Sequence, residues 1–172
     1  IITTTGFSTT DFNLWPQLSK TVLVILMFVG ACAGSTGGGI KVSRIMILFK
    51  TIGKEIRMLI HPRMIQKIKQ DDHVVSHEVI RSTNVFIAVY SIILFLSVLL
   101  ISIDNFDFTT NFTAVAATLN NIGPGLELVG PTGNFSIFSA FSKYVLMFDM
   151  LAGRLGLFPM LILFHPSCWK KY

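Results

Sequence analysis

Long uncharged stretches alternate with short polar ones along the chain, and three of them are candidate membrane helices. Residues 84–103 carry no charged side chain, and a helix of that length covers about 30 Å, the thickness of the hydrocarbon core. Residues 138–164 are also long enough, although they include Asp149 and Arg154. Residues 21–49 are apolar but are interrupted by the glycine-rich segment 34–39. The pattern predicts an all-α integral membrane protein with one interrupted helix.

A shorter apolar stretch lies between the second and third of these helices. Residues 108–120 are mostly small and apolar, follow Asp107 as an N-cap, and are too short to span a membrane. Residues 121–125 contain Gly-Pro-Gly and cannot continue a helix. A half-helix followed by irregular backbone between two spans is typical of a re-entrant pore loop. Such backbone persists at membrane depth only where it lines water or is buried in protein.

The composition excludes a soluble enzyme and a disordered tail. Hydrophobic residues make up 52% of the chain, charged residues 13%, and mean hydropathy is +0.66, whereas typical soluble domains are about 25% charged. The net charge of +5 could suggest nucleic acid as a partner. Nine of the 14 basic residues, however, lie between 41 and 81, and none lies between 104 and 135. The positive-inside rule therefore predicts that residues 54–83 and the C-terminus are cytoplasmic, without any nucleic-acid partner.

Other candidate chemistry is weak. Cys32 and Cys168 are isolated, so neither a disulfide nor a metal site is expected. His73 and His77 are not in the order of a zinc-protease motif, and the glycines at 34–39 are not placed as in a phosphate-binding loop. No cofactor is expected. The chain opens on Ile1 without Met or a basic leader, and we interpret it as a fragment.

An internal repeat organises the chain. Aligned with an offset of 123, residues 19–30 and 142–153 share six identities in twelve positions. Each copy is preceded by a short polar segment centred on a glycine, 3–8 in one case and 120–125 in the other. The repeating unit is a span, a half-helix, a glycine loop and a second span. We therefore predict that residues 1–53 end one unit, that 54–83 form a basic connection, and that 84–172 form a complete unit.

Four motifs in order carry a resemblance to a known family. They are Thr4-Thr5-Gly6-Phe7, the segment 33–41, Asn121-Ile122-Gly123-Pro124-Gly125 and Leu151-Ala152-Gly153-Arg154-Leu155. They resemble the Trk/Ktr/HKT superfamily of potassium transporters, most closely the bacterial Trk-type membrane subunit. The resemblance extends over nearly the whole chain. It implies that this chain corresponds to the last two of four repeats. It also implies that the protein is a homodimer in the inner membrane and that a cytoplasmic nucleotide-binding subunit regulates it.

The glycine segments are the candidate selectivity filter. A cation filter replaces water with backbone carbonyls, and a residue without Cβ allows the tight turn this requires. An ordinary turn is the alternative reading. In the family that it resembles, each of four repeats supplies one quarter of a ring of carbonyls around the ion. The resemblance therefore implies that this chain supplies two quarters of that ring. The predicted filter residues are Thr4, Thr5, Gly6, Phe7, Asn121, Ile122, Gly123 and Pro124.

The glycine-rich break and one arginine are the candidate gate. By resemblance, the break is an intramembrane loop that obstructs ion passage below the filter; a packing kink is the alternative. An arginine near mid-span should face a cavity or a partner, and by resemblance Arg154 points into the pore beside this loop. Asp149 lies about 140° away around the helix, so we doubt a direct pair and assign it no role. The predicted gate residues are Gly34, Ser35, Thr36, Gly37, Gly38, Gly39 and Arg154.

The resulting prediction is potassium uptake across the cytoplasmic membrane through a gated, glycine-centred filter, without covalent chemistry. Glu127 would concentrate cations at the outer mouth, or be an exposed acid with no role. Two alternatives remain: a non-conducting membrane scaffold or receptor subunit, and a sodium-coupled carrier of an organic substrate. The residues do not distinguish potassium from sodium selectivity, and they exclude neither proton nor sodium coupling.

Overall fold

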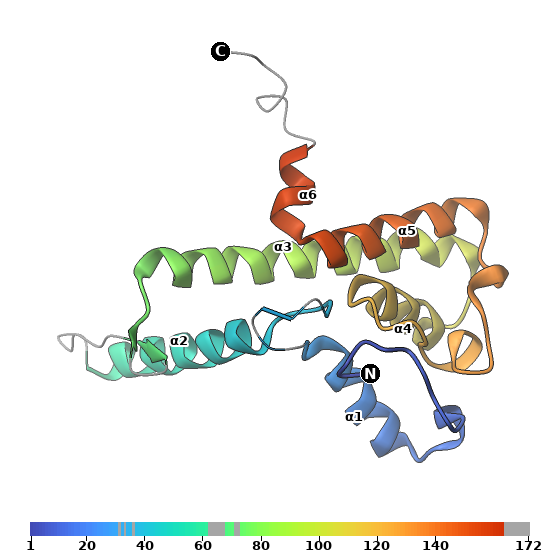
Figure 1. Ribbon diagram of the computed structural model, residues 1–172, viewed down its shortest axis with the longest axis horizontal. Coiled ribbons are helices and arrows are strands. Elements are labelled where there is room, and N and C mark those ends of the chain that lie inside the picture. Colours follow the sequence, from blue (N-terminus) through green and yellow to red (C-terminus); the bar gives the residue numbers. More distant parts are fainter. Residues whose placement is uncertain (31, 33, 36, 62–67, 71–72, 164–172) are drawn as a thin grey trace, which may run out of the picture.

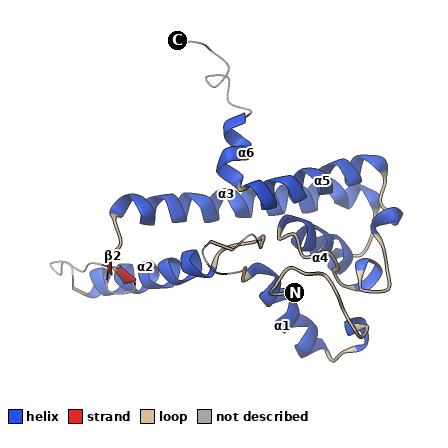
Figure 2. Cartoon of the chain, in the orientation of Figure 1, coloured by secondary structure: helices blue, strands red, loops and turns tan. Residues whose placement is uncertain are grey.

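The computed structural model describes residues 1–30, 32, 34–35, 37–61, 68–70 and 73–163. Within these ranges the chain is helical apart from one small ribbon (Figures 1 and 2). The α-helices are α1 (Gln17–Phe28), α2 (Val42–Ile60), α3 (His77–Ile101), α4 (Phe108–Leu119), α5 (Ala140–Leu155) and α6 (Leu157–Leu163). The 3₁₀ turns are η1 (Phe12–Leu14), η2 (Ser102–Asp104), η3 (Glu127–Val129) and η4 (Phe135–Ile137). The ribbon pairs β1 (Lys69–Gln70) with β2 (His73–Val74) in antiparallel fashion.

The long helix α3 is the central element of the fold. Ser76 caps it by accepting a hydrogen bond from the Val79 N–H, and this starts the helix seven residues before the apolar run at 84. With η2 it extends from His77 to Asp104, and among the described residues it is the one helix long and apolar enough to cross a membrane by length and composition. The apolar helix α1 is shorter, with 12 residues.

The core lies where α3, α4 and α5 meet. α5 runs back alongside α3, and α4 lies beneath this pair (Figure 1). One face of α3 is buried at helical spacing, while large apolar residues on its other face are exposed. This exposed face suits contact with lipid. The buried residues of the three helices include Phe86, Tyr90, Leu94, Val98, Ile101, Ala114, Val115, Leu119, Leu146 and Ala152.

The first predicted helix is interrupted, as its glycines suggest, but over a longer stretch than 34–39. α1 ends at Phe28 and α2 begins at Val42. The connecting segment folds back on itself, because the Gly30 N–H donates to the Ile40 carbonyl at 2.9 Å. The Lys41 ammonium donates to the carbonyls of Ser35 and Gly37 at 2.7 and 2.6 Å. Lys41 therefore stabilises the folded-back segment through hydrogen bonds to its backbone carbonyls.

The last predicted span, 138–164, is not one helix over the residues described. α5 ends at Leu155, and α6 turns away from it after Gly156 (Figure 1). Gly156 has φ of 92°, a conformation that side chains disfavour, so the chain changes direction here. Pro159, in the first turn of α6, needs no N–H partner there. Phe164 lies outside the described residues.

Candidate functional site

The two glycine segments touch each other. Thr4 and Asn121 both have φ of 53°, and Gly6 and Gly123, two residues further on, are also at positive φ, 77° and 110°. A Cβ added at Gly6 would lie 2.7 Å from the Ile122 carbonyl oxygen, too close for any side chain. A Cβ at Gly123 would lie 3.6 Å from the Gly6 Cα. The two segments, 117 residues apart, thus have positive φ at matching positions and are in contact with each other.

The half-helix α4 supports the second segment. Asp107 caps α4 by accepting from the Thr109 N–H at 2.9 Å, and α4 is almost completely buried, with Ala114 to Ala117 fully inaccessible. The Ile122 N–H donates to the Ala117 carbonyl at 2.8 Å, which closes the helix. The carboxyl end of α4, with its partial negative charge, therefore adjoins residues 121–125.

The glycine-rich loop packs directly against the end of α4. A Cβ at Gly38 would lie 2.2 Å from the Asn120 carbonyl oxygen, and one at Gly39 would lie 2.8 Å from Asn120 Oδ1. Asn120 is fully buried, and its Oδ1 accepts a 2.9 Å hydrogen bond from the Tyr90 hydroxyl on α3. Only residues without side chains fit at 38 and 39, so the loop lies immediately beneath the second glycine segment.

Arg154 and the glycine-rich loop line one cavity of about 240 Å³. The cavity wall also carries two further cations, Lys41 and Arg44, and the guanidinium of Arg44 lies 3.8 Å from the centre of the Phe86 ring. Ser35, Gly37 and Gly39 supply the loop side of the wall. Four of the predicted gate residues, Ser35, Gly37, Gly39 and Arg154, therefore line one cavity; Gly34 and Gly38 do not line it, and Thr36 lies outside the described residues.

The helix α5 approaches the end of α4 at Gly153. A Cβ there would lie 1.9 Å from the Leu119 carbonyl oxygen, and the Asn121 amide donates to the Met150 carbonyl at 3.0 Å. Gly30, at the matching position of the predicted repeat, is crowded by its own loop, since a Cβ there would lie 2.6 Å from the Gly38 carbonyl oxygen. Gly153 therefore allows α5 to approach α4, whereas Gly30 allows the glycine-rich loop to fold back closely.

Asp149 is fully buried between α5 and α3. Its Oδ1 accepts a 2.8 Å hydrogen bond from the Ser97 hydroxyl, and its Oδ2 has no hydrogen-bond partner among the described residues. Its contact is with α3, which is consistent with our doubt about a direct pair with Arg154. Ser97 was not singled out from the sequence. A hydroxyl within an uncharged, apolar span was the available signal.

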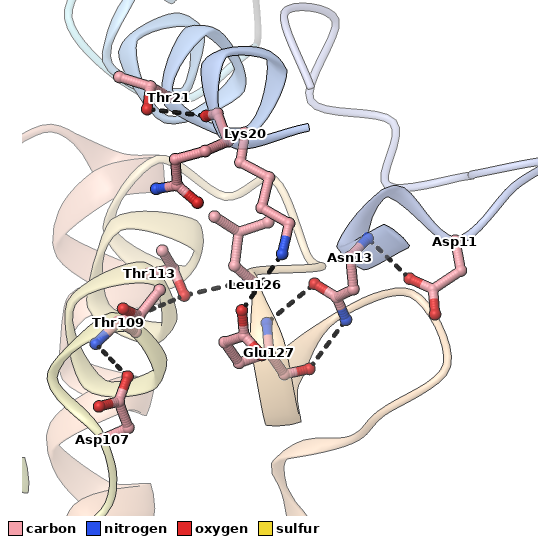
Figure 3. A network of polar contacts seen from close by, with 10 residues as sticks. Asp11, Asn13, Lys20, Thr21, Asp107, Thr109, Thr113, Leu126 and Glu127 are labelled. Carbon is pink, nitrogen blue, oxygen red and sulfur yellow. Dashed lines mark hydrogen bonds and ion pairs between the residues drawn. The ribbon is translucent and has the colours of Figure 1, made fainter. Parts of the chain in front are cut away.

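Glu127 is partly exposed and also contacts residues near the N-terminus of the chain. Its carboxylate Oε1 is 3.4 Å from the Lys20 ammonium on α1. Its backbone N–H and C=O bond to the side chain of Asn13, which itself follows the first glycine segment (Figure 3). Sequence reasoning missed Asn13, Tyr90 and Asn120 because their partners are distant in the chain. An Asn or Tyr in an apolar setting was the only local signal.

Comparison with known proteins places these features in a family. A family model described as "Cation transport protein", TrkH, matches residues 2–171. The Trk system potassium uptake protein TrkH of Escherichia coli K12 is 38% identical over 98% of this chain and 35% of its own length. The protein of the same name from Vibrio parahaemolyticus is 39% identical over 99% of this chain and 35% of its length.

The fold agrees with that assignment. The crystal structure of the potassium transporter TrkH from Vibrio parahaemolyticus superposes with a TM-score of 0.84 at 38% identity, covering 98% of this chain and 36% of that one. The chain thus spans about a third of the length of these relatives. The resemblance drawn from the four motifs is confirmed, and so is the helical character of the fold. The chain belongs to the TrkH family of cation transport proteins.

Proposed function

We propose that this chain forms part of a potassium-uptake pore in the cytoplasmic membrane. The observation that carries the proposal is the contact between Gly6 and the Ile122 carbonyl, where two segments of matching conformation meet beside the carboxyl end of α4. The names of the relatives, potassium uptake proteins, support the choice of ion. The chain contributes residues 4–7 and 121–124 to the ring, and the other quarters come from repeats outside it.

The filter acts through its backbone. Backbone carbonyls replace the hydration shell of the ion, and the negative end of α4 lowers the energy of a cation beside residues 121–124. Glu127 lies at the outer mouth, where its pairing with Lys20 leaves it less effective in attracting cations than a free acid. No residue undergoes covalent change, and no cofactor takes part.

The glycine-rich loop and Arg154 form the gate on the cytoplasmic side of the filter. The loop lies beneath Asn120, so an ion leaving the filter meets it first. Arg154, Lys41 and Arg44 face the same cavity, and their positive charge opposes a cation there. Opening requires the loop to leave Asn120, a movement that glycine backbones make at low cost.

The rest of the assembly follows from the same proposal. Residues 54–83 and the C-terminus face the cytoplasm, the exposed apolar face of α3 contacts lipid, and the protein is a homodimer controlled by a nucleotide-binding subunit. A membrane potential of about 100 mV supplies about 2.3 kcal/mol per charge, which sustains roughly a 50-fold gradient. Gated passive uptake therefore accumulates potassium without obligatory coupling.

Rubidium uptake by the full-length protein in a potassium-uptake-deficient host tests conduction. We expect saturable rubidium uptake that potassium inhibits more strongly than sodium. Absence of uptake by a protein that reaches the membrane would refute conduction and favour the scaffold alternative. Uptake that requires sodium and an organic solute would favour the carrier.

The same assay tests the gate. A unit charge about 10 Å from the ion opposes it by roughly 1.7 kcal/mol at an effective dielectric of about 20, so Arg154→Ala should raise rubidium flux about tenfold. Arg154→Lys keeps the charge and should raise flux much less. Equal effects of the two substitutions, or a lower flux in Arg154→Ala at normal abundance, would remove Arg154 from the gate.

A further inference from the structure

The side chain of Asn13 joins the two units just beyond their glycine segments. Its Oδ1 accepts from the Glu127 N–H at 2.9 Å, and its Nδ2 donates to the Glu127 carbonyl at 3.0 Å (Figure 3). We call this pair of hydrogen bonds the Asn13–Glu127 bracket. One primary amide thus satisfies both polar groups of a residue 114 positions away.

Both sides of the bracket are firmly held. The Asn13 N–H donates to Asp11 Oδ1 at 2.9 Å within the η1 turn. On the other side, the Leu126 N–H donates to the buried Thr113 hydroxyl of α4 at 3.0 Å (Figure 3). A Cβ at Gly130 would lie 2.2 Å from Asn13 Nδ2, so the amide also packs closely against Gly130.

The bracket lies in a part of the second unit that the first unit lacks. The glycine segments of the two units are 117 residues apart, whereas the 3₁₀ turns that follow them, each capped by its preceding Asp11 or Asn134, are 123 apart. The second unit therefore has six additional residues between its glycine segment and this turn. Glu127 lies within that addition, and it is the point at which the second unit contacts Asn13.

The bracket supports an uncommon backbone conformation at Glu127, together with the hydrogen bond from the Gly130 N–H to the Glu127 carbonyl. Its φ is 53°, a left-handed conformation that non-glycine residues seldom adopt. Such conformations persist where surrounding contacts determine them. The bracket uses only the N–H and C=O of Glu127, while the carboxylate pairs separately with Lys20. The role of the bracket is therefore separable from the charge of Glu127.

We propose that Asn13 is a positioning residue for ion selectivity, acting through the Asn13–Glu127 bracket. The inference rests on the proposed function of the glycine segments as a filter. A ring of carbonyls discriminates between ions only if its quarters keep their separation. The bracket follows Phe7 and Pro124 by six and three residues and ties the two segments together on the side away from the glycine-rich loop.

The test compares rubidium with sodium uptake by the full-length protein in potassium-uptake-deficient cells. Asn13→Ala should lower the rubidium-to-sodium uptake ratio about fivefold to tenfold, the effect of losing discrimination worth roughly one hydrogen bond. Ser136→Ala is the matched control, because Ser136 is the equivalent position of the second unit and its side chain bonds only to Asn134 among the described residues. Glu127→Gln removes the carboxylate charge at the outer mouth and leaves the bracket, so total uptake of both ions should fall slightly while their ratio is kept.

Membrane abundance is measured for each variant. Where Asn13→Ala does not accumulate, Asn13→Ser replaces it, since its side chain is polar but too short to reach both groups. A wild-type ratio in the Asn13 variants would overturn the inference. A loss of ratio in Glu127→Gln equal to that in the Asn13 variant would assign the effect to the carboxylate and overturn it too. Absence of uptake by the wild type would instead contradict the proposed function itself.

Discussion

At the scale of single residues, Asn120 connects three parts of the molecule. Its side chain accepts from Tyr90 on α3 and donates to the Ala116 carbonyl at 2.8 Å, and its backbone carbonyl lies against Gly38. Because Asn120 is fully buried, a substitution or movement that broke these hydrogen bonds would leave the polar groups without a partner and without water to replace it. Its conformation therefore fixes the position of the glycine-rich loop relative to the end of α4.

The Tyr90 hydroxyl is the accessible test of this arrangement. Tyr90→Phe removes the donor and leaves Asn120 Oδ1 buried without it, which should destabilise the purified full-length protein by about 1–2 kcal/mol. Denaturant or thermal unfolding in detergent measures the change. Tyr144→Phe is the control, because Tyr144 is 69% exposed in this chain and should change stability little. Equal stability of Tyr90→Phe and wild type would show that the hydrogen bond contributes nothing.

The glycines show how far the sequence predicts individual residues and where prediction stops. The tight turns at Gly6 and Gly123 were predictable because a positive φ restricts the residue type, and both glycines do have positive φ. The crowding at Gly38 and Gly153 arises from carbonyls distant in the chain. No local pattern specifies such a contact, so their partners were not predictable.

At the scale of elements, a carboxylate links the end of α3 to the start of α5. Asp104 Oδ2 accepts from the Ser139 N–H at 3.0 Å, and this hydrogen bond lowers the pKa of the Asp104 carboxyl from its usual 3.8. Because the folded-state pKa is depressed, the contribution to stability is present above the unfolded pKa. It is lost as pH falls through the folded-state pKa.

The expected outcome is a pH-dependent difference between wild type and Asp104→Asn. At pH 6 the wild type should be the more stable of the two, and the difference should shrink once the pH falls below about 4. Thermal unfolding at a series of pH values provides the measurement. A difference that stays constant down to pH 3 would show that the carboxylate charge plays no part.

Helix boundaries differ in how clearly the sequence marks them. α4 begins after Asp107, whose side chain caps it as the residue type suggests. The break at Gly156 was not predicted, because an isolated glycine in an apolar run is common inside membrane helices. The ribbon of β1 and β2 was not predicted either, since two-residue strands have no periodicity to detect.

Two glycines on different elements should respond oppositely to alanine. Gly156 has φ of 92°, so Gly156→Ala should destabilise the protein by about 1–3 kcal/mol. Gly53 lies inside α2 with nothing within 4 Å of an added Cβ, so Gly53→Ala should be neutral or stabilise it by up to about 1 kcal/mol. Thermal unfolding of both variants measures these effects. Destabilisation by Gly53→Ala as large as that by Gly156→Ala would argue against the conformational explanation.

At the scale of the whole molecule, three close contacts join the part of the chain before α3 to the part that follows, in addition to the packing of α1 against α4 and of α2 against α3. The glycine segments touch at Gly6 and Ile122, the glycine-rich loop meets α4 at Asn120, and Asn13 holds Glu127. Each contact joins residues more than 80 positions apart. These three contacts therefore add to the helix packing at positions where a glycine or a single amide cannot be exchanged freely.

Gly6→Ala tests whether the contact between glycine segments controls conduction. An added Cβ would lie 2.7 Å from the Ile122 carbonyl oxygen, at a φ of 77° that favours glycine. The segments must separate, so rubidium uptake by the full-length protein should fall by at least about tenfold, the effect of losing roughly 1.4 kcal/mol at the site. Ser8→Ala, two residues away on an exposed side chain, is the control and should conduct normally. An ion coordinated by both segments would bind less well once the segments are displaced. Wild-type rubidium uptake and selectivity in a Gly6→Ala protein that reaches the membrane would therefore show that the contact does not shape the ion site.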